Sequence, residues 1–159
     1  MEAHEIKRLM ERLIRVNRLH RSLIEKKIAE EDIHRGQMHQ LLYIMSSEKP
    51  PSQKELAAAF EVTPAAVAMS MKKLEQKGLI TRVPDPSDSR VNLLAVSEKG
   101  KRLIEENGRH FARIDQLMFD SISEADIDTL RATLDKVTQN LIDLGASDEM
   151  PVFMRQSKK

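Results

Sequence analysis

Residues 52–78, SQKELAAAFEVTPAAVAMSMKKLEQKG, decide the fold, because they have the pattern of two short helices joined by a tight turn. Ser52 and Glu55 have the spacing of a capping box, so the first helix is expected to begin there. Thr63-Pro64 combines a good N-cap with a proline that suits the first position of a helix, and Gly78 is a typical helix end. This arrangement predicts a helix-turn-helix.

Two runs of strand-forming residues follow, at 79–83 and 91–96, with the polar segment 84–90 between them. They predict a two-stranded hairpin with a charged tip. Ser97 then opens a helix expected to reach about Asp120, with a bend or loosening at Asn107-Gly108. A helix-turn-helix followed by such a hairpin is typical of a winged helix-turn-helix, whose second helix enters the major groove of DNA. The helical pair alone would also suit a generic packed pair of helices.

Long amphipathic segments flank this unit. Residues 2–29 and 35–45 carry apolar side chains at helical spacing, and the last helix, expected over 123–144, repeats them at alternating intervals of three and four. The N-terminal helix and the last two helices, expected over 97–120 and 123–144, carry three long apolar stripes, which is more than one small unit can cover, so a homodimer formed by these helices is expected. The fold class predicted is mainly α with a small β-hairpin, a winged helix-turn-helix flanked by long dimerisation helices.

The chain is expected to form a single domain over residues 1–145. Within it, residues 1–33 and 101–145 are predicted to be dimerisation helices. Residues 35–100 are predicted to form the winged helix-turn-helix, with the wing at about 79–96. Residues 146–159 are predicted to be a partly ordered C-terminal arm.

Composition excludes several classes of function. The 159 residues contain no cysteine, which removes disulfides, thiolate zinc sites and cysteine nucleophiles. No apolar run is long enough to span a membrane, and no signal peptide begins the chain, so a cytoplasmic protein without membrane association is expected. Net charge is only +1, but residues 70–102 hold eight basic and four acidic residues. A phosphate-facing surface should therefore belong to the middle of the chain.

Neither an enzyme nor a metal site is indicated. The sequence lacks a nucleophile elbow and a glycine-rich phosphate loop, so no catalytic residue is expected. The histidines do not have the spacing of metal ligands; they are His4, His20, His34, His39 and His110. His39 is of interest for its place near the junction of the dimerisation and DNA-binding regions, but a partly buried or surface histidine is the favoured interpretation.

The sequence resembles the multiple antibiotic resistance regulators, the MarR family. Four stretches carry the resemblance: residues 52–57 (SQKELA), 62–67 (VTPAAV), 73–80 (KLEQKGLI) and, most specific, 85–90 (DPSDSR) followed by 96–100 (VSEKG). The resemblance implies a homodimeric transcription regulator whose terminal helices dimerise and whose paired wings straddle an operator. It also implies that Arg90 enters the minor groove and that Asp88 holds it in place.

The chain departs from the family in two places. Glu61 occupies a turn position where many members have glycine, which indicates mild strain or a different turn geometry. The second helix also begins with alanine and methionine where relatives often have polar side chains. Lys72 and Lys73 are expected to bind phosphate, whereas the apolar residues offer contact only to groups such as thymine methyls. The residues expected at the DNA surface are Ser52, Gln53, Lys54, Thr63, Pro64, Ala65, Ala66, Ala68, Met69, Lys72, Lys73, Asp88 and Arg90.

The resemblance further implies an effector pocket between the dimerisation helices and the winged helix, for small anionic or aromatic compounds. Candidate lining residues are Arg15, Arg18, His39 and Tyr43. No cofactor is expected.

These inferences predict a dimeric regulator that binds double-stranded DNA at a palindromic operator and is a repressor released by a ligand. The alternative is a winged-helix module for protein interaction that keeps the dimer and has lost useful DNA affinity. The near-neutral charge and the apolar second helix favour this alternative, whereas the basic segment and the Asp88/Arg90 pair favour DNA binding.

Overall fold

The computed structural model describes residues 2–88 and 90–149. Within them it contains six helices and one antiparallel hairpin, which confirms the predicted fold class. The elements, in order, are α1 (Ala3–Ala29), α2 (Arg35–Ser46), α3 (Gln53–Ala59), α4 (Pro64–Gln76), β1 (Ile80–Pro84), β2 (Asn92–Val96), α5 (Glu98–Met118) and α6 (Glu124–Asp143). Of the predicted C-terminal arm, residues 150–159 lie outside the described residues.

The α3–α4 turn forms as its caps predict. The Ser52 hydroxyl accepts a hydrogen bond from the Glu55 amide while the Glu55 carboxylate accepts one from the Ser52 amide, which completes the capping box. The Thr63 hydroxyl caps α4 in the same manner. Glu61, between the two helices, has a φ of 52°, in the left-handed region that favours glycine. The turn therefore keeps its tight form and carries a small backbone cost at Glu61.

The hairpin is joined to the helices at its base. β1 and β2 pair antiparallel, with Ile80 opposite Val96, and Leu94 donates a backbone hydrogen bond to the carbonyl of Pro51 at 2.8 Å. The Ser97 hydroxyl caps α5 by accepting from the Gly100 amide and itself donates to the carbonyl of Gly78. The wing therefore has a fixed position relative to both α3 and the end of α4.

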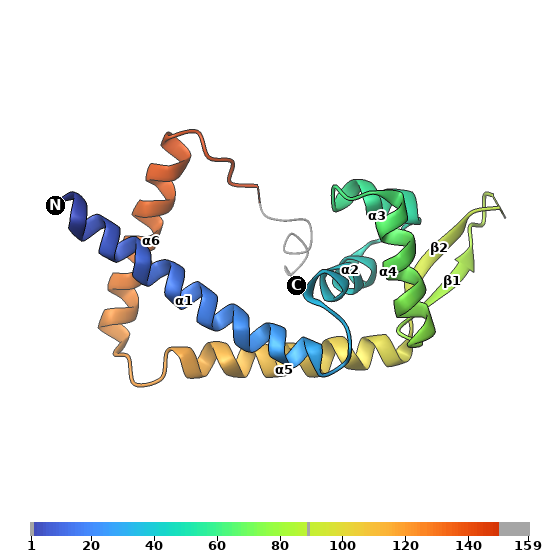
Figure 1. Cartoon of the computed structure of the whole chain (residues 1–159), viewed down its shortest axis with the longest axis horizontal. Helices are drawn as coiled ribbons and strands as arrows, with labels where there is room; N and C mark the ends of the chain where they lie inside the picture. The colour runs from blue at the N-terminus through green and yellow to red at the C-terminus, as the bar shows by residue number, and fades with distance from the viewer. Residues whose placement is uncertain (1, 89, 150–159) are drawn as a thin grey trace.

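α5 runs without a break from the wing to the far end of the molecule (Figure 1). The expected bend at Asn107-Gly108 is absent. Asn107 is buried within the helix and its side-chain amide donates to the carbonyl of Leu103, one turn earlier. Packing of Leu103 and Ile104 into the core keeps this stretch helical, which overrides the weak helix preference of the asparagine-glycine pair.

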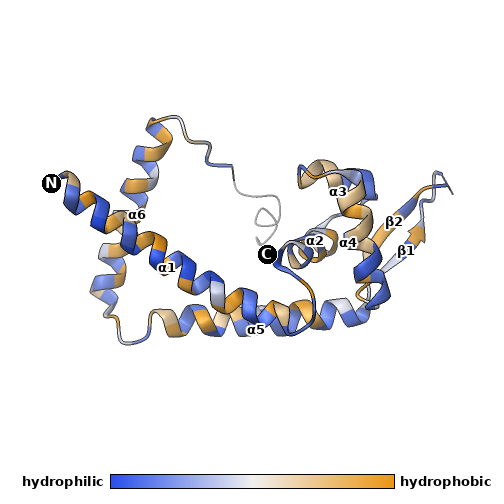
Figure 2. Ribbon diagram, viewed as in Figure 1, coloured by the Kyte–Doolittle hydropathy of each residue, from blue (hydrophilic) through white to orange (hydrophobic). Residues whose placement is uncertain are grey.

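The core lies within the winged helix-turn-helix and the ends of α1 and α5 next to it. Buried side chains from α2, α3, α4 and the hairpin meet there, among them Leu41, Leu56, Val67, Leu74 and Leu94. The opposite end of the molecule is different. α6 buries none of its residues, and hydrophobic residues recur along α1, α5 and α6 (Figure 2). Within the described residues of one copy, these apolar surfaces stay exposed to solvent.

Candidate nucleic-acid interface

The outward face of α4 is small and apolar. Val67, Met71 and Leu74 turn into the core, which leaves the predicted contact residues outside. Met69 is 76% exposed. Thr63, Pro64, Ala65, Ala66, Ala68 and Lys72 are also exposed. This face offers methyl and thioether groups rather than paired hydrogen-bond donors.

Lys72 and Lys73 do not have the same surroundings, although both were predicted to bind phosphate. Lys72 is exposed and makes no ion pair within the described residues. The Lys73 ammonium lies 3.4 Å from a carboxylate oxygen of Asp32, and that of Lys77 lies 2.8 Å from the other oxygen. Sequence reasoning missed Asp32, because it lies in the turn after α1, far from α4 along the chain.

The start of α3 is tied to the hairpin. With its carboxamide oxygen turned toward Arg82 of β1, Gln53 accepts hydrogen bonds from the guanidinium at 2.6 and 2.9 Å. The same guanidinium donates to Glu75 of α4 at 3.0 Å. Arg82 therefore joins three elements, and its charge is already paired. Lys54 remains exposed, and Ser52 is engaged in its cap.

The hairpin tip contains the acid and base that the sequence singled out. Arg90 donates to the two carboxylate oxygens of Asp88 at 3.0 and 3.1 Å, and its backbone amide donates to the same side chain. Arg90 is 88% exposed in its side chain. These hydrogen bonds hold the pKa of Asp88 below its ordinary value, so the carboxylate stays charged. The pair is a charge-assisted contact on a protruding loop.

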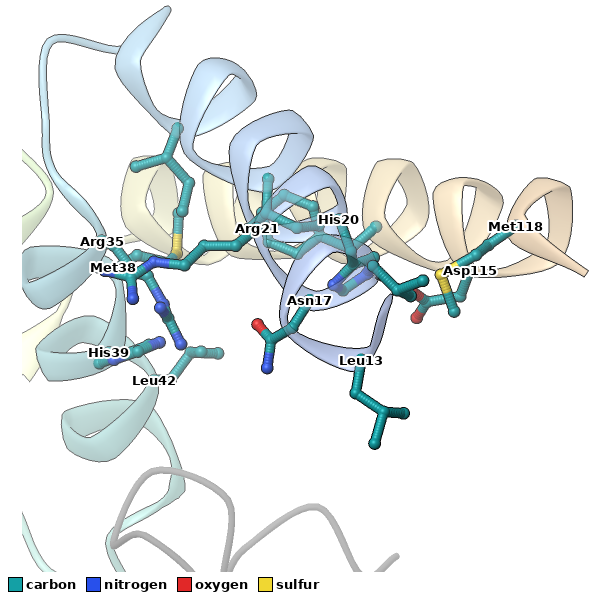
Figure 3. A pocket seen from close by; sticks show the side chains of 14 residues that line it. Leu13, Asn17, His20, Arg21, Arg35, Met38, His39, Leu42, Asp115 and Met118 are labelled. Carbon is teal, nitrogen blue, oxygen red and sulfur yellow. Dashed lines mark hydrogen bonds and ion pairs between the residues drawn. The ribbon is translucent and has the colours of Figure 1, made fainter. Parts of the chain in front are cut away.

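A cavity of about 880 Å³ lies between α1, α2 and α5, beside the winged helix (Figure 3). Its walls are mainly apolar and include Leu13, Ile24, Met38, Leu42, Phe111 and Met118. Of the four predicted lining residues, His39 is present, but Arg15, Arg18 and Tyr43 are not. Tyr43 instead packs edge-on against Phe60, with ring centroids 5.6 Å apart. Helical spacing alone could not distinguish the cavity side of α1 from its other faces.

Polar groups gather on two sides of this cavity. Arg21 extends from α1 toward α2, where Arg35 and His39 lie (Figure 3). Across from them, His20 and Asp115 are joined at 2.8 Å and connect α1 to α5. Burial, together with the charge of Arg35, lowers the pKa of His39 to about 4, so this histidine is neutral at pH 7. The cavity therefore combines apolar walls with two guanidinium groups, of which that of Arg21 is paired with Glu25 at 2.7 Å.

Among residues 2–88 and 90–149, no group of three or more histidine, aspartate or glutamate side chains is placed to hold a metal ion. No helix in the described part of the chain has the length and apolar character needed to cross a membrane.

A helix-turn-helix with an outward second helix and an arginine-tipped hairpin beside it defines a winged-helix DNA-binding protein. Comparison with known sequences identifies its family. Residues 31–91 match the MarR family. Over 115 residues the chain is 30% identical to the HTH-type transcriptional regulator YybA of Bacillus subtilis (strain 168), with 69% of this chain and 73% of that protein covered.

Solved structures agree. A variant of S. aureus MepR bound to an oligodeoxyribonucleotide is 26% identical, with a TM-score of 0.68 that covers 85% of this chain and 97% of that one. The YusO protein from Bacillus subtilis is 21% identical and shares the fold, with a TM-score of 0.78 over 87% of this chain and 99% of that one. The chain belongs to the MarR family of winged helix-turn-helix, DNA-binding transcription regulators, which are not enzymes. This confirms the resemblance seen in the sequence.

Proposed function

We propose that the protein is a dimeric, ligand-responsive repressor that binds a palindromic operator. The observation that carries the proposal is the separation of two surfaces (Figure 1). α3, α4 and the hairpin lie at one end, whereas the uncovered apolar faces of α1 and α6 lie at the other. A second copy that covers the apolar end leaves the DNA-binding end of both copies free.

The dimer's two-fold symmetry determines how it meets DNA. The two α4 helices enter successive major grooves about one helical turn, roughly 10 base pairs, apart. Ala65, Ala68 and Met69 contact thymine methyls, and Lys72 binds a flanking phosphate. Arg90 enters the adjacent minor groove, where Asp88 orients its guanidinium.

The cavity supplies the response to a ligand. Its apolar walls suit an aromatic or aliphatic body, and the guanidinium group of Arg35 suits an anionic group on that body. Because α1 and α5 line one side and α2 the other, a bound molecule separates the dimer helices from the winged helix. Such a movement changes the distance between the two α4 helices and so releases the operator.

Selection of bound fragments from random and genomic DNA tests this function. We expect one imperfect palindrome, and we expect insertion of five base pairs at its centre to abolish tight binding, because the half-sites then lie on opposite faces of the duplex. Equal affinity after the insertion, or recovery of no common sequence, would contradict symmetric operator binding. Increased transcription from the selected promoter in a deletion strain would support repression.

A further inference from the structure

The turn between α1 and α2 presents a carboxylate to the recognition helix α4. Asp32 has a φ of 50°, in the left-handed region, and its side chain is 79% exposed. From this position it pairs with both Lys73 and Lys77, at 3.4 and 2.8 Å. These pairs hold the pKa of Asp32 below its ordinary value, with the Lys77 hydrogen bond as the largest cause, so the carboxylate is charged at neutral pH.

The two lysines lie one helical turn apart at the end of α4. Lys73 is also one turn beyond Met69, on a helix whose outer face is proposed to lie in the major groove. The side of α4 that carries them faces α2 at Ser70, which donates to Gln40 at 2.5 Å. Lys73 and Lys77 thus border the outer face, where a lysine can reach the phosphates that flank the groove.

We propose that Asp32 limits the affinity of this protein for DNA of any sequence, by occupying Lys73 and Lys77 in competition with DNA phosphates. The proposal rests on the proposed docking of α4. Lysine contacts to phosphate strengthen binding to all duplexes alike, so Asp32 lowers the overall affinity for DNA and leaves the ratio of operator to nonspecific affinity to the sequence-dependent contacts.

The competition is possible because the shared carboxylate is exposed: the Asp32 side chain is 79% exposed and that of Lys73 is 43% exposed, whereas that of Lys77 is 25% exposed. Exposed pairs contribute little to stability, so a phosphate can displace the carboxylate at small cost. A lysine that binds phosphate releases cations condensed on the DNA. The displaced Asp32 carboxylate takes up a cation in turn, which offsets part of that release. Removing the Asp32 charge should therefore steepen the salt dependence of binding.

Asp32→Asn is the suitable variant, because asparagine tolerates the left-handed backbone as well as aspartate does. Full-length wild type and variant are titrated against a mixed-sequence duplex of about 30 base pairs at several salt concentrations. We expect the slope of log K against log salt to become more negative by about 0.9, with roughly fivefold tighter binding near 0.15 M salt. Affinity for the selected operator should rise by a similar factor, because phosphate contacts do not depend on sequence.

Two controls separate this mechanism from a general charge effect. Glu31→Gln makes the same charge change one residue away, at an exposed side chain that pairs with no lysine of α4 within the described residues. It should have the smaller effect. In a Lys73→Gln/Lys77→Gln background, Asp32→Asn should change neither slope nor affinity beyond the Glu31→Gln effect.

Equal effects of Asp32→Asn and Glu31→Gln would overturn the proposal, as would a gain that persists without the two lysines. Either result would leave the proposed operator binding unaffected, so it would count only against the role of Asp32. If the wild type bound no duplex even at low salt, the proposed function and this inference would both be wrong.

Discussion

The Arg90 side chain is exposed to solvent and at the same time hydrogen-bonded to Asp88. Its guanidinium protrudes from the hairpin tip but is held by both oxygens of Asp88. A narrow, A·T-rich minor groove concentrates negative potential and attracts such a group. We expect Arg90→Ala to weaken operator binding by about 1–3 kcal/mol per half-site, with folding and dimerisation unchanged. Titration at fixed salt measures operator affinity, and circular dichroism and sedimentation check that folding and dimerisation are unchanged.

Asp88→Ala tests the role of the carboxylate by the direction of its effect. Simple electrostatics predicts tighter binding when a negative charge near DNA is removed. An orienting carboxylate predicts weaker binding, and it also predicts that the double variant is no weaker than Arg90→Ala alone. Tighter binding by Asp88→Ala would show that the tip is only a charged loop.

Gly100 is required by a close approach of backbone. A Cβ at this position would collide with the carbonyl oxygen of Leu79, which joins α4 to β1. We expect Gly100→Ala to lower the free energy of unfolding by about 1–3 kcal/mol, as overpacking does. Gly108 in the same helix has open space around it, so Gly108→Ala should instead raise stability by about 0.5–1 kcal/mol. Urea unfolding compares the two, and equal shifts would contradict the steric argument.

His39 makes stability depend on pH in a defined window. Its pKa is lowered to about 4 in the folded protein, from 6.5, so at mildly acidic pH the unfolded chain takes up a proton that the folded chain refuses. Stability should therefore be lost as the pH falls from about 6.5 to 4, by roughly 2–3 kcal/mol from this residue. His39→Gln should remove that part of the slope. Parallel unfolding free energies for wild type and variant across the window would contradict it.

The outward surface of the recognition helix α4 is largely apolar. Because its outward residues are alanine and methionine, we expect its sequence preference to arise from thymine methyls and DNA shape. Replacing a contacted thymine by uracil in the selected operator should weaken binding by about 0.8 kcal/mol per methyl. Uracil outside the half-sites serves as the control. No loss at any position would leave shape and phosphate contacts as the sources of affinity.

The helices and strands could be predicted well from the sequence, because residues close together in the chain determine where each element begins and ends. Ser52, Thr63 and Gly78 begin or end helices through hydrogen bonds and a backbone conformation that depend on near neighbours. The predicted bend at Asn107-Gly108 was wrong, because burial of this part of α5 in the core keeps it helical. The Asp32 ion pairs and the cavity side of α1 could not be predicted, because both join segments far apart in the chain.

At the scale of the whole molecule, the uncovered apolar faces are the basis for the proposed dimer. Leu134 and Leu141 lie seven residues apart on α6 and are 44% and 52% exposed. We expect Leu134→Asp/Leu141→Asp to dissociate the dimer or to unfold the chain, because it places two charges in the interface. Sedimentation at micromolar concentration measures the mass, and a folded wild-type monomer under these conditions would contradict the dimer.

A matched control exists on the opposite face of α6. Ala132 and Gln139 are also seven residues apart and exposed. Ala132→Asp/Gln139→Asp adds the same two negative side chains where no apolar stripe runs, so the dimer should persist. Dissociation by both pairs would indicate that charge on α6, rather than loss of apolar contact, disrupts assembly.

Because α5 is one continuous helix, a tilt at one of its ends would also displace the other end. Its 21 residues make a rod of roughly 30 Å, with one end among the apolar helices and the other fixed to α4 and the wing. A tilt of about 10° at the far end moves the wing by roughly 5 Å, a sizeable part of the half-site separation of about 34 Å. A hinge at Asn107-Gly108 would absorb that tilt. Because the helix is continuous there, we expect a small change beside the cavity to reach the DNA end at full amplitude.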